Sequence, residues 1–284
     1  MRISLLDACE AILGYLLFVW IIDLVIRRLP SKGLTAESWA LLQLVLVLAV
    51  LVVFHLLRKR SESYYCMRLP EGDGLHLMLK FVVLLMPLAL IARLAVPSFD
   101  AWYAGLAGLG SWTAVLSLSA LMPILVMKEE LIERILIQRK LEAYPVWIVL
   151  VVVSLNFAFA HFFWNGSLQF VLAQTLAVFF GSLLLVLFFA MTRNIWLSIL
   201  LHLIYNLLIV LQIYLHVARP MMEWVFWIVM ILLCAAVLPS AARRVKDFFA
   251  KSKRHPMSAG DWVFIALFAL VVPVAFIVLS RFTP

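Results

Sequence analysis

Six residues able to do chemistry lie inside long apolar stretches of this chain. They are two acids, an arginine, two histidines and an asparagine: Glu129, Glu130, Arg134, His161, His202 and Asn206. An ionisable side chain near the centre of a membrane helix costs roughly 2.5–3.5 kcal/mol on insertion scales, so each is a candidate functional residue.

Glu130 and Arg134 are four residues apart, which places them on one side of a helix. There the guanidinium can hold the carboxylate by a bidentate hydrogen bond. Glu129 projects about 100° away and is left free for other chemistry. The alternative is a surface charge cluster at a helix end, with Lys128 and Glu133 as incidental members.

Two later pairs repeat the four-residue spacing: Phe157 with His161, and His202 with Asn206. A carboxylate and an imidazole can share a water, one taking its proton and the other orienting it. A second histidine with an asparagine can donate hydrogen bonds to the oxyanion of a tetrahedral intermediate. The alternatives are an interfacial histidine at 161 and a plain interhelical hydrogen bond at 202, worth about 0.6 kcal/mol.

The nucleophile expected from these residues is water. Ser154 precedes His161, but no base and orienting group can be assembled around it for a covalent route. Zinc held by Glu129, His161 and His202 is an open alternative. We expect no cofactor, because the HExxH arrangement is absent and Arg134 would repel a cation.

Composition defines the elements that must position these residues. The chain is 66% hydrophobic with a mean hydropathy of +1.11, against roughly 45–50% apolar residues in soluble domains. The apolar runs are continuous rather than alternating, which predicts an all-α polytopic transmembrane bundle of eight to nine spans. The candidate spans are 10–26, 38–57, 76–97, 114–138, 146–164, 168–191, 195–216, 222–241 and 261–280, with an interfacial or re-entrant segment at 99–112.

Depth brings the candidate residues together. At 1.5 Å per residue, Glu129 lies about 15 Å from Lys140, His161 about 22 Å from Val146 and His202 about 12 Å from Asn194. All then fall in the middle third of a core about 30 Å thick. A short turn at 141–145 makes the fourth and fifth spans antiparallel neighbours, which predicts one buried polar centre.

The net charge of +8 comes from basic residues at helix ends, so we expect no nucleic-acid partner. Arginine and lysine favour a cytoplasmic N-terminus, which also makes 242–260 a basic cytoplasmic loop that anchors the chain at anionic headgroups. The first apolar run has no small-residue cleavage signature and is expected to be a retained helix. Cys9, Cys66 and Cys234 show no metal-ligand spacing and are expected to be inert.

The ordered motifs Glu129-Glu130-x-x-x-Arg134, Phe157-x-x-x-His161 and His202-x-x-x-Asn206 resemble those of the CAAX protease and bacteriocin-processing family, called CPBP or Abi. Gly181 and Thr192-Arg193-Asn194-Ile195-Trp196 fit the same family, and the resemblance covers about 115–210. Many members have Phe-Arg-Gly where this chain has Glu133-Arg134-Ile135, a departure that bears on packing and substrate entry.

The resemblance implies a glutamic-type intramembrane endopeptidase of the bacterial inner membrane. Glu129 would activate water with His161, His202 and Asn206 would stabilise the oxyanion, and Glu130, Arg134 and Phe157 would support them. The expected regions are N-terminal helices at 1–112, a catalytic core at 113–216, and C-terminal helices with the basic loop at 217–284.

The expected substrate is a protein or peptide, lipidated or not, cut near its C-terminus or a membrane-proximal segment. A prenylated CAAX tail, a bacteriocin leader and a sorting tail all fit. One alternative is a non-catalytic scaffold or immunity protein, as the resemblance also implies. A proton-relay transporter ranks last, because no inverted repeat or paired broken helix is evident.

Overall fold

The computed structural model describes residues 72–95, 112–142, 144–161, 168–252, 257–263 and 265–266, with positions 44, 45, 48, 49, 52 and 66. Three predicted spans, at 10–26, 38–57 and 261–280, and the interfacial segment at 99–112 lie wholly or mostly outside these residues, as do Cys9 and most of the loop 253–260.

The described residues form helices and, among them, no strand. In chain order the elements are α3 (Gly72–Ala95), α5 (Trp112–Glu130), the π-helix η3 (Leu131–Gln138), α6 (Arg139–Leu141), α7 (Val146–Ala160), α8 (Leu168–Thr192), α9 (Ile195–Ala218) and α10 (Pro220–Lys251). The all-helical class predicted from continuous apolar runs is confirmed.

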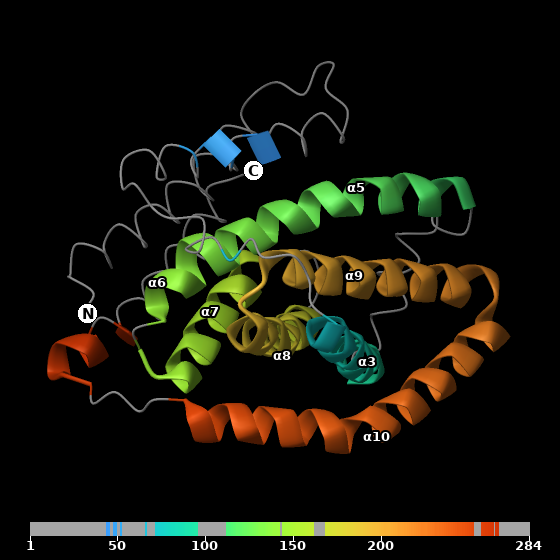
Figure 1. Cartoon of the computed structure of the whole chain (residues 1–284). Coiled ribbons are helices and arrows are strands. Elements are labelled where there is room, and N and C mark those ends of the chain that lie inside the picture. Colours follow the sequence, from blue (N-terminus) through green and yellow to red (C-terminus); the bar gives the residue numbers. More distant parts are fainter. Residues whose placement is uncertain are drawn as a thin grey trace.

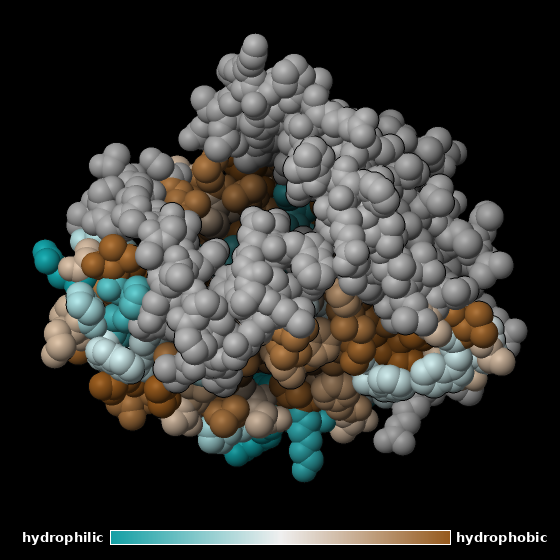
Figure 2. Space-filling model, turned by 180° about the vertical axis from the view of Figure 1, so that it is seen from behind, coloured by the Kyte–Doolittle hydropathy of each residue, from teal (hydrophilic) through white to brown (hydrophobic). Residues whose placement is uncertain are grey.

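Four of these helices, α3, α8, α9 and α10, are long and apolar enough to cross a membrane. Along α10 large apolar side chains stand exposed, among them Trp224, Ile228 and Leu232. Apolar side chains likewise cover most of the coloured surface in Figure 2. Such a surface suits lipid, so the chain is an integral membrane protein. The described residues do not establish eight or nine spans.

Figure 1 shows how the helices pack. α5 lies along α9, α8 packs against α7 and α3, and α10 runs across α3 and α9. Phe81 of α3 and Phe188 of α8 are fully buried, with ring centroids 5.3 Å apart. A Cβ on Gly74 would come within 2.6 Å of Leu197 Cδ1, so the absence of a side chain at this position makes room for Leu197 of α9 against α3.

Two predictions about helix ends were wrong. α7 ends at Ala160 instead of continuing to 164, and at 15 residues it is about 22 Å long, too short to cross alone. At the other end of the fold, α10 continues to Lys251 through the first half of the predicted basic loop. Residues 242–251 contain no glycine or proline, so nothing in them ends the helix.

The turn between α8 and α9 aligns the two helices. Arg193 closes α8 in the left-handed region, with φ of 50°, in a position more often taken by glycine. Asn194 then caps α9, because its side-chain oxygen accepts a hydrogen bond from Leu197 N at 3.0 Å. Arg193 and Arg139 both pair with Glu142, which ties this turn to the end of α6.

A second buried polar cluster joins α9 to α10. Glu223 is 1% exposed and accepts hydrogen bonds from Gln212 at 2.7 Å and Trp227 at 3.3 Å. Its second oxygen lies 2.9 Å from His216 Nδ1. Since both carboxylate oxygens have partners, the cluster fixes the start of α10 against the end of α9.

Candidate active site

The central acids stand where an α-helix becomes a π-helix. Glu129 and Glu130 end α5, and η3 begins at Leu131. The N–H of Arg139 bonds to the carbonyl oxygen of Arg134, five residues back, as in π-helical geometry. π-helical turns are rare and recur at functional sites. The sequence predicted an ordinary helix here, and no residue type in this segment signals the change.

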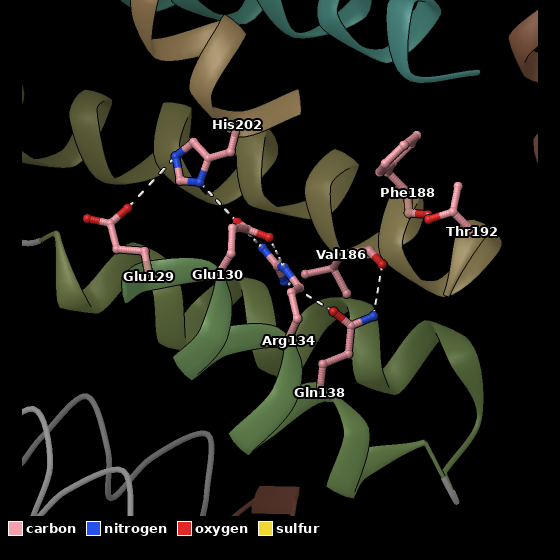
Figure 3. A network of polar contacts seen from close by, with 8 residues as sticks. All are labelled: Glu129, Glu130, Arg134, Gln138, Val186, Phe188, Thr192 and His202. Carbon is pink, nitrogen blue, oxygen red and sulfur yellow. Dashed lines mark hydrogen bonds and ion pairs between the residues drawn. The ribbon is translucent and has the colours of Figure 1, made fainter. Parts of the chain in front are cut away.

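A row of buried side chains follows this helix. The Nε and Nη2 atoms of Arg134 donate to the two oxygens of Glu130, at 2.9 and 3.4 Å. Its Nη1 donates to Gln138 Oε1 at 3.2 Å, and Gln138 Nε2 donates to the carbonyl oxygen of Val186 on α8 at 2.9 Å (Figure 3). Glu130, Arg134 and Gln138 are each 0% exposed. The row therefore links η3 to α8 through charged and amide groups that no water reaches.

Glu130 also positions a histidine from a different helix. Its Oε1 lies 2.9 Å from Nδ1 of His202 on α9. Because Glu130 is ion-paired to Arg134, its carboxylate acts as the acceptor and Nδ1–H as the donor. This contact directs the opposite ring nitrogen, Nε2, towards Glu129 (Figure 3).

The Glu129 carboxylate faces two histidines. Its Oε1 lies 3.7 Å from His161 Nε2, and its Oε2 lies 3.8 Å from His202 Nε2. Both distances exceed a direct hydrogen bond and lie within the range of an ion-pair contact. Three elements, the end of α5, the end of α7 and the middle of α9, thus direct polar atoms to one point.

His161 owes its orientation to the end of α7. Its Nδ1 lies 2.8 Å from the Phe157 carbonyl oxygen, which only accepts hydrogen bonds, so Nδ1 carries a proton. The Phe157 ring packs on the His161 ring at 4.3 Å and meets the His202 ring edge-on at 5.9 Å. Phe157 thus packs against both imidazoles.

Other predicted residues lie less centrally. Asn206 is one turn beyond His202 on the same side of α9, half-buried. Ser154 is fully buried, and its hydroxyl has no hydrogen-bond partner among the described residues. A Cβ on Gly181 would meet Leu85 at 4.0 Å, an ordinary contact, so space there does not require glycine.

Exposure separates the residues into two groups. The Glu129 and His161 side chains are 24% and 29% exposed, whereas Glu130 and Arg134 are sealed. The accessible pair is therefore the one that a water and a substrate can reach. The sealed pair can only orient its neighbours.

Two buried residues of the site were not predicted from the sequence. Gln138 extends the row, and the four-residue step from Glu130 through Arg134 could have indicated it. Glu133, which the sequence marked as incidental, is buried at 3% exposure. No sequence signal separates a buried glutamate from an exposed one at this position.

In the part of the chain that the structure describes, no three His, Cys, Asp or Glu side chains are arranged to hold a metal ion. His161 and His202 both face Glu129, but the three side chains are not arranged to bind one metal ion. The chemistry of the site is therefore described with water and these side chains.

Residues 109–208, 100 of the 284 residues, match the family model described as Type II CAAX prenyl endopeptidase Rce1-like. The match agrees with the resemblance of these residues to CPBP proteins and, in an apolar helical protein, supports a role as an intramembrane protease. No curated protein and no solved structure matches the chain.

Proposed function

We propose that this protein is an intramembrane endopeptidase of the glutamic type. The observation that carries the proposal is the Glu129 carboxylate, whose two oxygens face the Nε2 atoms of His161 and His202 from two other helices. Such a carboxylate, held beside imidazoles and partly open to water, is suited to activate water for attack on a peptide carbonyl.

In this proposal a water lies beside Glu129 and His161, on their exposed side, where it can hydrogen-bond to both side chains. Glu129 takes a proton from the water while the water oxygen attacks the carbonyl carbon of the substrate peptide bond. Glu129 later delivers that proton to the leaving amine. The Nδ1–H group of His161 donates a hydrogen bond to the Phe157 carbonyl oxygen, so Nε2 remains available to orient the water.

The oxyanion that forms would be stabilised by His202 and Asn206, one turn apart on α9. Because Nδ1 of His202 donates to Glu130, Nε2 donates to the oxyanion only when the ring carries both protons. The adjacent Glu130 carboxylate holds Nδ1–H and so keeps Nε2 directed at the site, which gives the buried Glu130–Arg134 pair a role in the reaction.

We propose a peptide substrate cut near its C-terminus or a membrane-proximal segment, in the bacterial inner membrane. The family description names prenyl endopeptidases, so a prenylated tail is one candidate beside an unmodified leader or sorting segment. Comparative proteomics of a deletion strain should reveal proteins whose terminal segment is no longer removed.

The test uses purified protein with a peptide identified in this way. Glu129→Gln and His161→Ala should each lower kcat by about 10²–10⁴-fold, the range for a lost general base. Asp247→Asn makes the same carboxylate-to-amide change on the exposed surface of α10 and should leave cleavage unchanged. Chelator treatment should also leave it unchanged.

Full cleavage by both site variants would refute the proposal. If the wild-type protein releases no product from any candidate, and the site variants instead alter recovery of a bound protein, the non-catalytic scaffold becomes the better description.

A further inference from the structure

Glu133 is a buried acid that the proposed mechanism does not use. It lies in the first turn of η3, between the central acids and Arg134, and is 3% exposed. An acidic side chain is rarely buried to this extent unless it is paired.

Glu133 has no such pairing in the described structure. Its Oε2 is buried with no hydrogen-bond partner, and no described residue forms an ion pair with it. The adjacent Arg134 does not serve, because its Nε and Nη2 atoms bond to Glu130 and its Nη1 bonds to Gln138. The guanidinium next in sequence is therefore already engaged elsewhere.

Glu133 lies close in the helix to Glu129, which with His161 forms the accessible pair of the site. Glu133 follows Glu129 by four residues, which places both on the same side of the helix. Glu133 thus lies one helical turn from the carboxylate that faces water, and is itself buried.

Packing does not account for this arrangement. A buried polar atom without a partner destabilises a fold, and an apolar side chain of similar volume would be better suited to that environment. Groups that cost stability persist where they contribute to function. Glu133 therefore fits a group whose hydrogen bond forms only during the reaction.

We propose that Glu133 is a third functional carboxyl of this site, a positioning residue that acts on the Glu129–His161 pair. Its free oxygen accepts a hydrogen bond from the substrate or from a second water when the site is occupied. A bond made only in the occupied site raises kcat and not substrate affinity. This inference rests on the proposed peptidase activity.

The test combines two variants with a matched control. Glu133→Leu removes the carboxyl and keeps the volume, while Glu133→Gln keeps a hydrogen-bonding head of the same shape. Ser154→Ala removes another buried, unpartnered oxygen, on α7 about 10 Å along the helix from His161. For each we would measure Tm in detergent, kcat and KM.

We expect Glu133→Leu to raise Tm by a few degrees and to lower kcat about tenfold, with KM changed less than twofold, as for one lost hydrogen bond. Glu133→Gln should retain at least a third of kcat. Ser154→Ala should raise Tm or leave it unchanged and keep kcat.

Two results would overturn the inference. A raised Tm with unchanged kcat would make Glu133 incidental, and a lowered Tm with poor accumulation in the membrane would make it structural. The proposed function fails separately, if the wild-type protein shows no cleavage that depends on Glu129.

Discussion

The buried ion pair of Glu130 and Arg134 shows how single residues depend on one another here. Both side chains are fully sealed from solvent, and the guanidinium contacts both carboxylate oxygens. Desolvating two charges offsets most of their attraction, so such a pair adds little net stability. Removing one partner is costly, because it leaves the other charge buried alone.

Arg134→Met should therefore lower the free energy of unfolding by about 3–5 kcal/mol. The double variant Glu130→Gln with Arg134→Met should lose less than the sum of the two single variants, because neither charge is then left uncompensated. Denaturant unfolding in detergent would measure both.

Arg193→Met is the matched control. Arg193 pairs with Glu142 at the surface, with 47% of its side chain exposed. Its loss should cost about 0–1 kcal/mol. Equal losses for Arg134 and Arg193 would show that burial of the inner pair has no energetic consequence.

Among the elements, the junction of α5 and η3 matters most, because its side chains reach three other helices. Glu130, at the end of α5, reaches α9 through His202, and Gln138 of η3 reaches the backbone of α8 at Val186. Glu129 faces His161 at the end of α7. A small rotation of the helix at this junction would change all three contacts together.

Gln138→Leu should reveal this dependence. It leaves one Arg134 N–H without a partner and removes the additional hydrogen bond to the Val186 carbonyl, so the free energy of unfolding should fall by about 1–3 kcal/mol. Cleavage should fall as well, because Arg134 then holds Glu130 and His202 less firmly. Unfolding and kcat would be measured on the same preparations.

Gln138→Glu provides a sharper comparison. A second carboxylate beside Arg134 competes with Glu130 for the guanidinium and has no N–H for the Val186 carbonyl. It should lower kcat at least as much as Gln138→Leu. If both variants behave like the wild type, the row of hydrogen bonds does not position the site.

On the scale of the whole molecule, α10 relates the fold to the membrane. Its 32 residues are about 48 Å long, more than a core of about 30 Å requires. Its last turns carry Arg243, Arg244 and Lys246, which are exposed. The excess length therefore suits a helix whose basic end extends into the headgroup region.

The predicted orientation can be tested at the two ends of α10. In a background where all three cysteines are replaced by alanine, Lys251→Cys should react with an impermeant maleimide only in inside-out vesicles. Arg219→Cys, exposed at the start of α10, should react only in intact cells. The reverse pattern would invert the topology predicted from charge.

The sequence by itself determined the class of fold and the candidate residues. Continuous apolar runs require helices in a membrane, and the four-residue spacings place Arg134 beside Glu130 and Asn206 beside His202 on their own helices. These are local properties, set by helix geometry and by the cost of placing charge in lipid.

Only the tertiary structure decided which residues meet across helices. The end of α7 at Ala160, the π-helical turns of η3 and the contact from His202 to Glu130 all depend on packing between segments far apart in the chain. For the same reason Glu133 could not be separated from a surface residue by sequence, and the four-residue step from Arg134 indicated at most the side of the helix on which Gln138 lies: burial is set by the neighbouring helices.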